Sequence, residues 1–154
     1  MTPKNFPHKF LLSPGDWTGE GKLLLNMVGE DLNFLASWNI PSKDQAGKIQ
    51  CVQEIQIHGL SESMRNEISF FDFAPNSFCV EMENPNVGRV LGTGTFDDKL
   101  IAWEFRENDL NFEGFETYIL QEDGSYVMHG EYVSSDQFRT QIQGKIWVKN
   151  EEKK

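Results

Sequence analysis

The side chains best suited to acid–base chemistry lie close together in the C-terminal half of the chain. Glu116 and Tyr118 fall in one short segment, and His129 and Glu131 fall in the next. Carboxyl, phenol and imidazole groups that a fold brings together can move protons to and from a substrate, or bind the polar head of a ligand. These four residues are therefore the candidates for the catalytic site of an isomerase, hydrolase or lyase.

The turn at residues 122–124 decides which of these side chains share a face. If Asp123-Gly124 is a two-residue loop, Tyr118 lies opposite His129 and the two glutamates face each other, which forms a titratable patch. If Gly124 takes the left-handed position of a three-residue loop, Tyr118 faces Met128 in an aromatic-lined, apolar pocket. The first register suits acid–base work and the second suits ligand binding, and the sequence leaves both open.

A charged pair precedes this region. Glu104 and Arg106 alternate with Trp103 and Phe105, so the two charges share one face of a strand and the two rings share the other. In one interpretation the charges form an outer ion pair while the rings fill the core. In the other, the interior is partly polar and Arg106 binds the carboxylate of a ligand there.

The sequence predicts no metal site. Its three histidines, His8, His58 and His129, lie in separate segments and lack the close second ligand that metal sites have. The two cysteines, Cys51 and Cys79, form no CxxC pair and are too few for a disulfide framework. We expect both cysteines to be reduced, structural thiols.

Short alternating segments must position these side chains. Together they predict about ten antiparallel strands, at residues 16–28, 32–40, 48–58, 64–73, 77–83, 87–96, 99–107, 112–121, 125–134 and 138–149. A meander of this size hides its edge strands by closing on itself. The predicted fold is therefore all-β, a single closed antiparallel up-and-down β-barrel.

The chain divides into three parts. Residues 1–14 form a leader whose apolar side chains, Phe6, Phe10, Leu11 and Leu12, are expected to plug one end of the barrel. Residues 15–149 form the barrel domain, and residues 150–154 form a frayed tail. Trp147 falls on the outer row of the last strand, which leaves a homodimer open.

The run Trp17-Thr18-Gly19-Glu20-Gly21, with Gly15 and the leader before it and the meander after it, resembles the opening of the calycin barrels. These are the lipocalins, the fatty-acid-binding proteins and the nitrobindin-like domains, and the W-x-G-x-G form is nearest to bacterial lipocalin-like domains and nitrobindins. The resemblance implies a calycin-like barrel over residues 15–149 with a ligand inside. Nitrobindins hold haem through a histidine near the C-terminal end. The last strand here has no histidine, so no cofactor is predicted, although His129 one strand earlier leaves haem open.

The charge and hydropathy of the chain limit which binding partners and which location we expect. Asp and Glu number 24 against 14 Lys and Arg, which gives a formal net charge of -10. Such a field repels nucleic-acid phosphates and anionic lipids, so neither nucleic acid nor membrane is expected as a partner. Because the chain shows neither a signal peptide nor a run of about 20 apolar residues, we expect it in the cytoplasm.

These observations favour one function over two alternatives. The leading hypothesis is binding of a small, largely hydrophobic molecule, fatty-acid-like or tetrapyrrole-like, inside the barrel. Its expected binding residues are Trp17, Trp103, Glu104, Arg106, Tyr118, Tyr126, Met128, His129 and Tyr132. The alternatives are a barrel enzyme that uses the Tyr/His/Glu cluster, and a non-catalytic interaction module with a filled core and an acidic surface.

Overall fold

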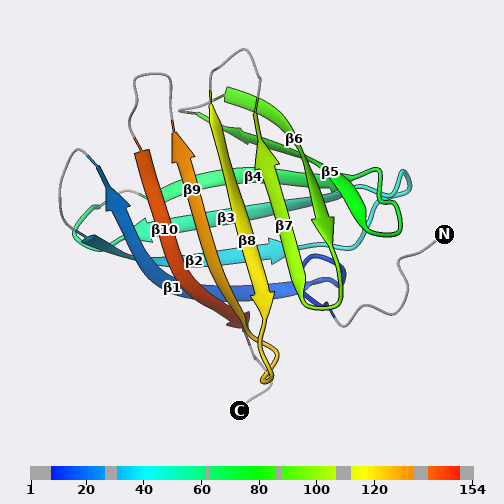
Figure 1. The fold of residues 1–154 in the computed structure, drawn as a ribbon, viewed down its shortest axis with the longest axis horizontal. Coiled ribbons are helices and arrows are strands. Elements are labelled where there is room, and N and C mark those ends of the chain that lie inside the picture. Colours follow the sequence, from blue (N-terminus) through cyan, green and yellow to red (C-terminus); the bar gives the residue numbers. More distant parts are fainter. Residues whose placement is uncertain are drawn as a thin grey trace.

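The barrel is complete and closed. The computed structural model describes residues 8–26, 31–61, 63–85, 88–106, 112–133 and 139–149. Its strands are β1 (Gly15–Leu25), β2 (Asp31–Ile40), β3 (Ile49–Ile57), β4 (Ser63–Phe71), β5 (Ser77–Asn84), β6 (Gly88–Phe96), β7 (Leu100–Phe105), β8 (Glu113–Leu120), β9 (Tyr126–Val133) and β10 (Arg139–Val148). Each strand pairs with its neighbours in the chain, and β1 pairs antiparallel with β10 to close the ring (Figure 1). The predicted ten-strand up-and-down barrel is confirmed.

Strict alternation of buried and exposed residues explains why these segments are strands. In β2, Phe34, Ala36 and Trp38 are buried, whereas Leu35 and Ser37 between them are exposed. Successive side chains of a strand point to opposite faces of the sheet, so each strand contributes one row to the interior. The polar row of each strand therefore faces outward, and a polar residue on the inner row is an exception.

Glycines allow the barrel to close where β1 meets β10. Gly21 lies opposite Gly144. A Cβ atom on Gly144 would lie 2.5 Å from the carbonyl oxygen of Glu20, and one on Gly21 would lie 2.7 Å from Cα of Gly144. Any side chain at these two positions would push the strands apart. The glycines of the opening run thus permit the close approach of the first and last strands.

The described part of the leader covers one end of the barrel. The ring of Phe10 is fully buried, and its centroid lies 5.2 Å from those of Trp17 and Trp38. Leu11 is also buried and Leu12 is half-buried, while Phe6 lies outside the described residues. This is the plug expected from the apolar side chains of the leader, and we refer to this end as the closed end.

The apolar interior is divided into two clusters. The main cluster includes Phe10 and the interior tryptophans, and it extends over most of the strands. The small cluster lies at the far end of β1 and β2 from Phe10, and its buried members are Leu23, Phe34 and Ala36. Partly buried residues pack against the small cluster, and these are Leu32, Ile55, Ile57 and Ile142. Among the residues that the structure describes, no helix has the length and apolar character needed to cross a membrane.

Candidate functional site

The β8–β9 turn selects one of the two registers that the sequence left open. The N–H of Gln121 donates to the carbonyl of Ser125 at 2.8 Å, and the N–H of Gly124 donates back to the carbonyl of Gln121. Gly124 has a φ of +90°, the left-handed value that favours glycine. This is the three-residue loop, and Tyr118 accordingly lies opposite Met128. The two-residue alternative is wrong.

This register separates the four residues of the proposed acid–base cluster. Glu116 and Tyr118 are buried on the inner row of β8. His129 and Glu131 lie on the outer row of β9, where the His129 side chain is 44% exposed and its Nε2 is 3.8 Å from a Glu131 carboxylate oxygen. Because a one-residue change of register moves a whole row of side chains to the other face, the prediction of one shared patch is wrong.

The Glu104 and Arg106 pair also lies outside the barrel. A guanidinium nitrogen of Arg106 is 2.8 Å from a Glu104 carboxylate oxygen, and both side chains are substantially exposed. Alternation in β7 turns Trp103 and Phe105 inward instead, where both are buried. The interpretation that Arg106 binds a ligand carboxylate in the interior is therefore wrong.

The remaining predicted wall residues are aromatic or apolar and lie in the interior. Trp17, Trp103, Tyr118, Tyr126 and Met128 are buried. Of these five, Tyr118 and Met128 line the interior cavity, whereas Trp17, Trp103 and Tyr126 pack in the main cluster behind it. Tyr132, the sixth, is half-buried and reaches the same region through Glu116.

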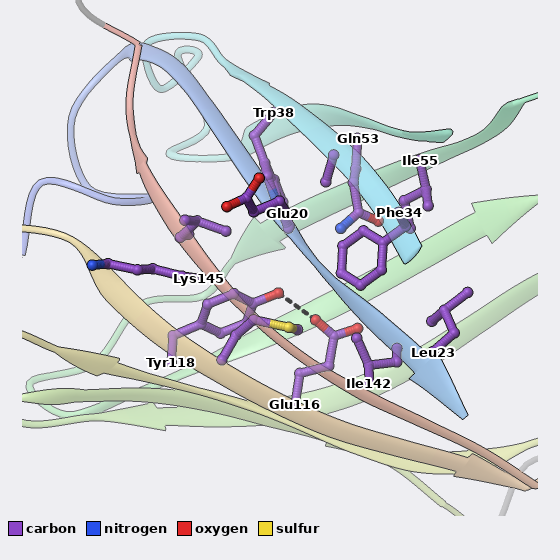
Figure 2. A pocket seen from close by; sticks show the side chains of 13 residues that line it. Glu20, Leu23, Phe34, Trp38, Gln53, Ile55, Glu116, Tyr118, Ile142 and Lys145 are labelled. Atoms are coloured by element: carbon purple, nitrogen blue, oxygen red, sulfur yellow. Dashed lines mark hydrogen bonds between the residues drawn. The ribbon is translucent and has the colours of Figure 1, made fainter. Parts of the chain in front are cut away.

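A cavity lies at the junction of the two clusters (Figure 2). Its volume is about 30 Å³, which is room for about two water molecules. Its lining comes from Leu23, Phe34, Ala36, Ile55 and Ile142 on one side, Trp38, Met128 and Ile146 on the other, and the polar residues Gln53, Glu116 and Tyr118. Glu20 and Lys145 border it beside Gly21 and Gly144, where the wall has no side chain.

Glu116 is a buried carboxyl group held by two phenols. It is 8% exposed, and its two oxygens accept hydrogen bonds from the hydroxyls of Tyr118 and Tyr132. Burial raises the pKa of Glu116, and the two phenol hydrogen bonds oppose this only in part. Two glycines make room for this arrangement. Gly130 lies opposite Glu116, and Gly114 lies opposite Tyr132, whose ring covers the space that a side chain there would need.

A chain of amides approaches the cavity from the opposite wall. Nδ2 of Asn84 donates to Oδ1 of Asn66 at 2.8 Å, and Nδ2 of Asn66 donates to Oε1 of Gln53 at 2.8 Å. These three residues are not among the site residues predicted from the sequence. The sequence does carry a signal for Gln53. This residue falls on the same row of β3 as the buried Cys51, so the alternation places its polar side chain on the inner face.

None of the three histidines faces the cavity. His8, at the closed end, has Nδ1 2.6 Å from the Tyr126 hydroxyl and Nε2 2.6 Å from the carbonyl of Asp97. His58 lies in an exposed turn after β3, and His129 is on the outer face. The residues present therefore do not fit a haem held by an internal histidine.

In the part of the chain that the structure describes, no group of three or more histidine, cysteine, aspartate or glutamate side chains could hold a metal ion.

Both cysteines are free thiols. Burial raises the pKa of the Cys51 thiol to about 12, which keeps it protonated at neutral pH. An unreactive, packed thiol at position 51 is the structural role predicted for it.

No protein-family model matches the sequence, and the search of curated proteins gave no significant match. The function has to be inferred from the geometry of the interior.

Proposed function

We propose that the barrel binds a small, largely apolar molecule in its interior, between the main and small clusters. The observation that carries this proposal is the cavity at their junction, with apolar walls and a few converging polar groups. This combination is typical of small-molecule sites. The opening run Trp17–Gly21 and the ten-strand closure support a barrel of calycin type, in which ligands are held inside.

The size of the cavity restricts the ligand. Sites for drug-sized molecules have volumes of about 300–1,000 Å³, against about 30 Å³ here. A ligand must therefore displace side chains, and Phe34 and Leu23 are the candidates because few buried residues hold them in place. A compact molecule needs less displacement than a fatty acid or a tetrapyrrole, so the geometry favours a compact ligand.

Tryptophan fluorescence and native mass spectrometry test the proposal. Trp38 lines the cavity, and the Trp103 ring centroid lies 6.3 Å from that of Trp38, so an internal ligand should change the emission. A panel of compact ring compounds, fatty acids and tetrapyrroles would be titrated into the protein. We expect a fluorescence change and a one-to-one mass increment for compact compounds.

A matched pair of variants shows where the compound binds. Ala36→Leu fills the cavity from the inner row, whereas Ser37→Leu adds an apolar side chain one residue later on the outer row. We expect Ala36→Leu to weaken binding at least about tenfold, a change of about 1.4 kcal/mol, and Ser37→Leu to leave binding unchanged. Circular dichroism checks that both variants fold. Absence of binding by every compound, or equal binding by the two variants, would contradict the proposal and favour the interaction module with a filled core.

A further inference from the structure

Gln53 presents an amide N–H to the cavity without an acceptor. The side chain is only 7% exposed, and its oxygen already accepts from Asn66. Its Nε2 has no hydrogen-bond partner among the residues that the structure describes, and it points into the cavity (Figure 2). No fully enclosed side-chain nitrogen or oxygen in the described residues lacks a partner, so this Nε2 must border open space. A buried donor of this kind favours a ligand that brings an acceptor.

The opposite wall supplies a second donor. When Glu116 is neutral, it carries one acid proton, and Tyr118 and Tyr132 carry one hydroxyl proton each. Only two hydrogen bonds join these three groups, so one of the three protons is left without a partner among them. If the acid proton of Glu116 occupies its contact with Tyr118, the hydroxyl proton of Tyr118 is released from that contact and can turn to a ligand in the cavity, which Tyr118 lines. Burial raises the pKa of Glu116, which favours this neutral state.

No buried side chain among the described residues that line the cavity carries a positive charge that could balance an anion. Among the described residues, Lys145 is the one basic side chain that borders the cavity, but it is half-exposed and its Nζ lies 4.0 Å from Asp123. A buried carboxylate without a cation is strongly disfavoured. The acceptor on the ligand must therefore be uncharged.

Resting on the proposed function above, we propose that the bound molecule carries an uncharged carbonyl oxygen, which accepts one hydrogen bond from Gln53 Nε2 and one from the Tyr118 hydroxyl. A carbonyl oxygen has two lone pairs in one plane and brings no proton of its own, so it satisfies both donors. An alcohol would add a donor, and a fatty acid would add a charge. The ligand class is therefore a compact, otherwise apolar ketone, aldehyde, ester or tertiary amide.

Three ring compounds of similar shape test this class with the wild-type protein. Cyclohexanone carries the carbonyl, methylenecyclohexane replaces its oxygen by a CH₂ group, and cyclohexanecarboxylate carries a charge. We expect cyclohexanone to bind at least about tenfold more tightly than methylenecyclohexane, as one net hydrogen bond of about 1.4 kcal/mol gives, and more tightly than the carboxylate. The carbonyl stretching band of bound cyclohexanone should shift to lower frequency, because hydrogen bonds weaken the C=O bond.

Variants assign the two donors. Gln53→Met and Tyr118→Phe each remove one of the two donors, and each should reduce the ratio of ketone to alkene affinity at least about threefold, which is half of the tenfold preference on the free-energy scale. Gln56→Met, on the exposed row of the same strand, is the matched control and should leave the ratio unchanged. Gln53→Met also removes the acceptor used by Asn66, so thermal unfolding is followed in parallel, and Tyr118→Phe together with the wild-type series decides the question if that variant does not fold.

The outcomes separate this inference from the proposed function. If the alkene binds as tightly as the ketone, or the carboxylate binds more tightly, the carbonyl assignment is overturned while internal binding stands. It is equally overturned if these three compounds fail and the members of the panel that bind carry no uncharged carbonyl group. If no compound binds at all, the proposed function fails, and the carbonyl assignment fails with it.

Discussion

The two apolar clusters of the barrel differ in how firmly they are packed. At the closed end, the ring of Phe10 has four aromatic neighbours, with centroids 5.1–5.5 Å away. At the other end, the small cluster has Leu23, Phe34 and Ala36 as its buried members among the described residues, and a cavity adjoins it. Buried polar groups also gather beside the small cluster, in Glu116 and Gln53. The main cluster is the firmly packed part of the interior, and the cavity lies in the more loosely packed region beside the small cluster.

Phe10→Ala should have the largest effect, because it empties the centre of the main cluster. Truncation of a fully buried phenylalanine removes about 3–5 kcal/mol from the free energy of unfolding, and Phe10 is fully buried. Urea denaturation measures the loss. Lys9→Ala, at the exposed neighbouring residue, is the control and should change little. A loss below about 1 kcal/mol, within the range of ordinary surface substitutions, would mean that the leader does not plug the barrel in solution.

Phe34→Ala should have a smaller effect, because the small cluster is already incompletely packed. We expect a loss of about 2 kcal/mol, below the about 3–5 kcal/mol of a phenylalanine truncated in a fully packed core, because fewer contacts are lost. The variant should also bind larger members of the ligand panel than the wild type does, since its cavity is enlarged. If Phe34→Ala destabilises the protein as much as Phe10→Ala, the two clusters are equally firm and the contrast between them disappears.

The main cluster and the fold were predictable from local pattern. The alternation Leu32, Phe34, Ala36, Trp38 and Ile40 predicted a strand at 32–40, and β2 is Asp31–Ile40. Period-two alternation is a property of consecutive residues, so it can be read without knowledge of which strands pair. Closure followed from the number of strands, because an open meander would leave exposed edges.

The polar site was predictable only in part. The sequence places Glu116 and Tyr118 in one segment, but the residues opposite them on β9 depend on the β8–β9 turn. That turn depends on the φ angle of Gly124, and a glycine is compatible with both turns. The Gln53 side chain accepts a hydrogen bond from Asn66 on the neighbouring strand, and this contact depends on which strands pair. The volume of the cavity depends on how all the side chains pack together, which no local pattern contains.

Glu116→Gln tests whether the buried carboxyl group beside the small cluster is protonated, through the dependence of the free energy of unfolding on pH. The pKa of Glu116 is raised above its ordinary value of 4.5, so the folded protein holds a proton that the unfolded chain releases. Stability must then fall as the pH rises above about 4.5, and Gln, which does not titrate, removes this fall. We expect the variant to gain stability relative to the wild type as the pH is raised above about 4.5, measured by urea denaturation. The exposed Glu104→Gln control should show no such gain, and a pH-independent difference for Glu116→Gln would show that this carboxyl group is ionised in the folded state.

His8→Gln should have the smallest effect, and it acts at the closed end with the opposite dependence on pH. Burial lowers the pKa of His8 below 6.5, although the carbonyl of Asp97 and the charges of Asp97 and Asp98 oppose this shift. The unfolded chain therefore takes up a proton first as the pH falls, so the wild type loses stability below about pH 6.5.

Glutamine at position 8 can donate to the Asp97 carbonyl and accept from Tyr126, as the neutral imidazole does. We expect the variant to be within about 1 kcal/mol of the wild type at pH 8 and to lose less stability between pH 6.5 and pH 5, measured by urea denaturation. His58→Gln, at an exposed turn, should follow the wild type at every pH. If His8→Gln follows the wild-type profile as well, the acid sensitivity arises elsewhere, and the closed end is held by Phe10 and its aromatic neighbours without a contribution from the imidazole.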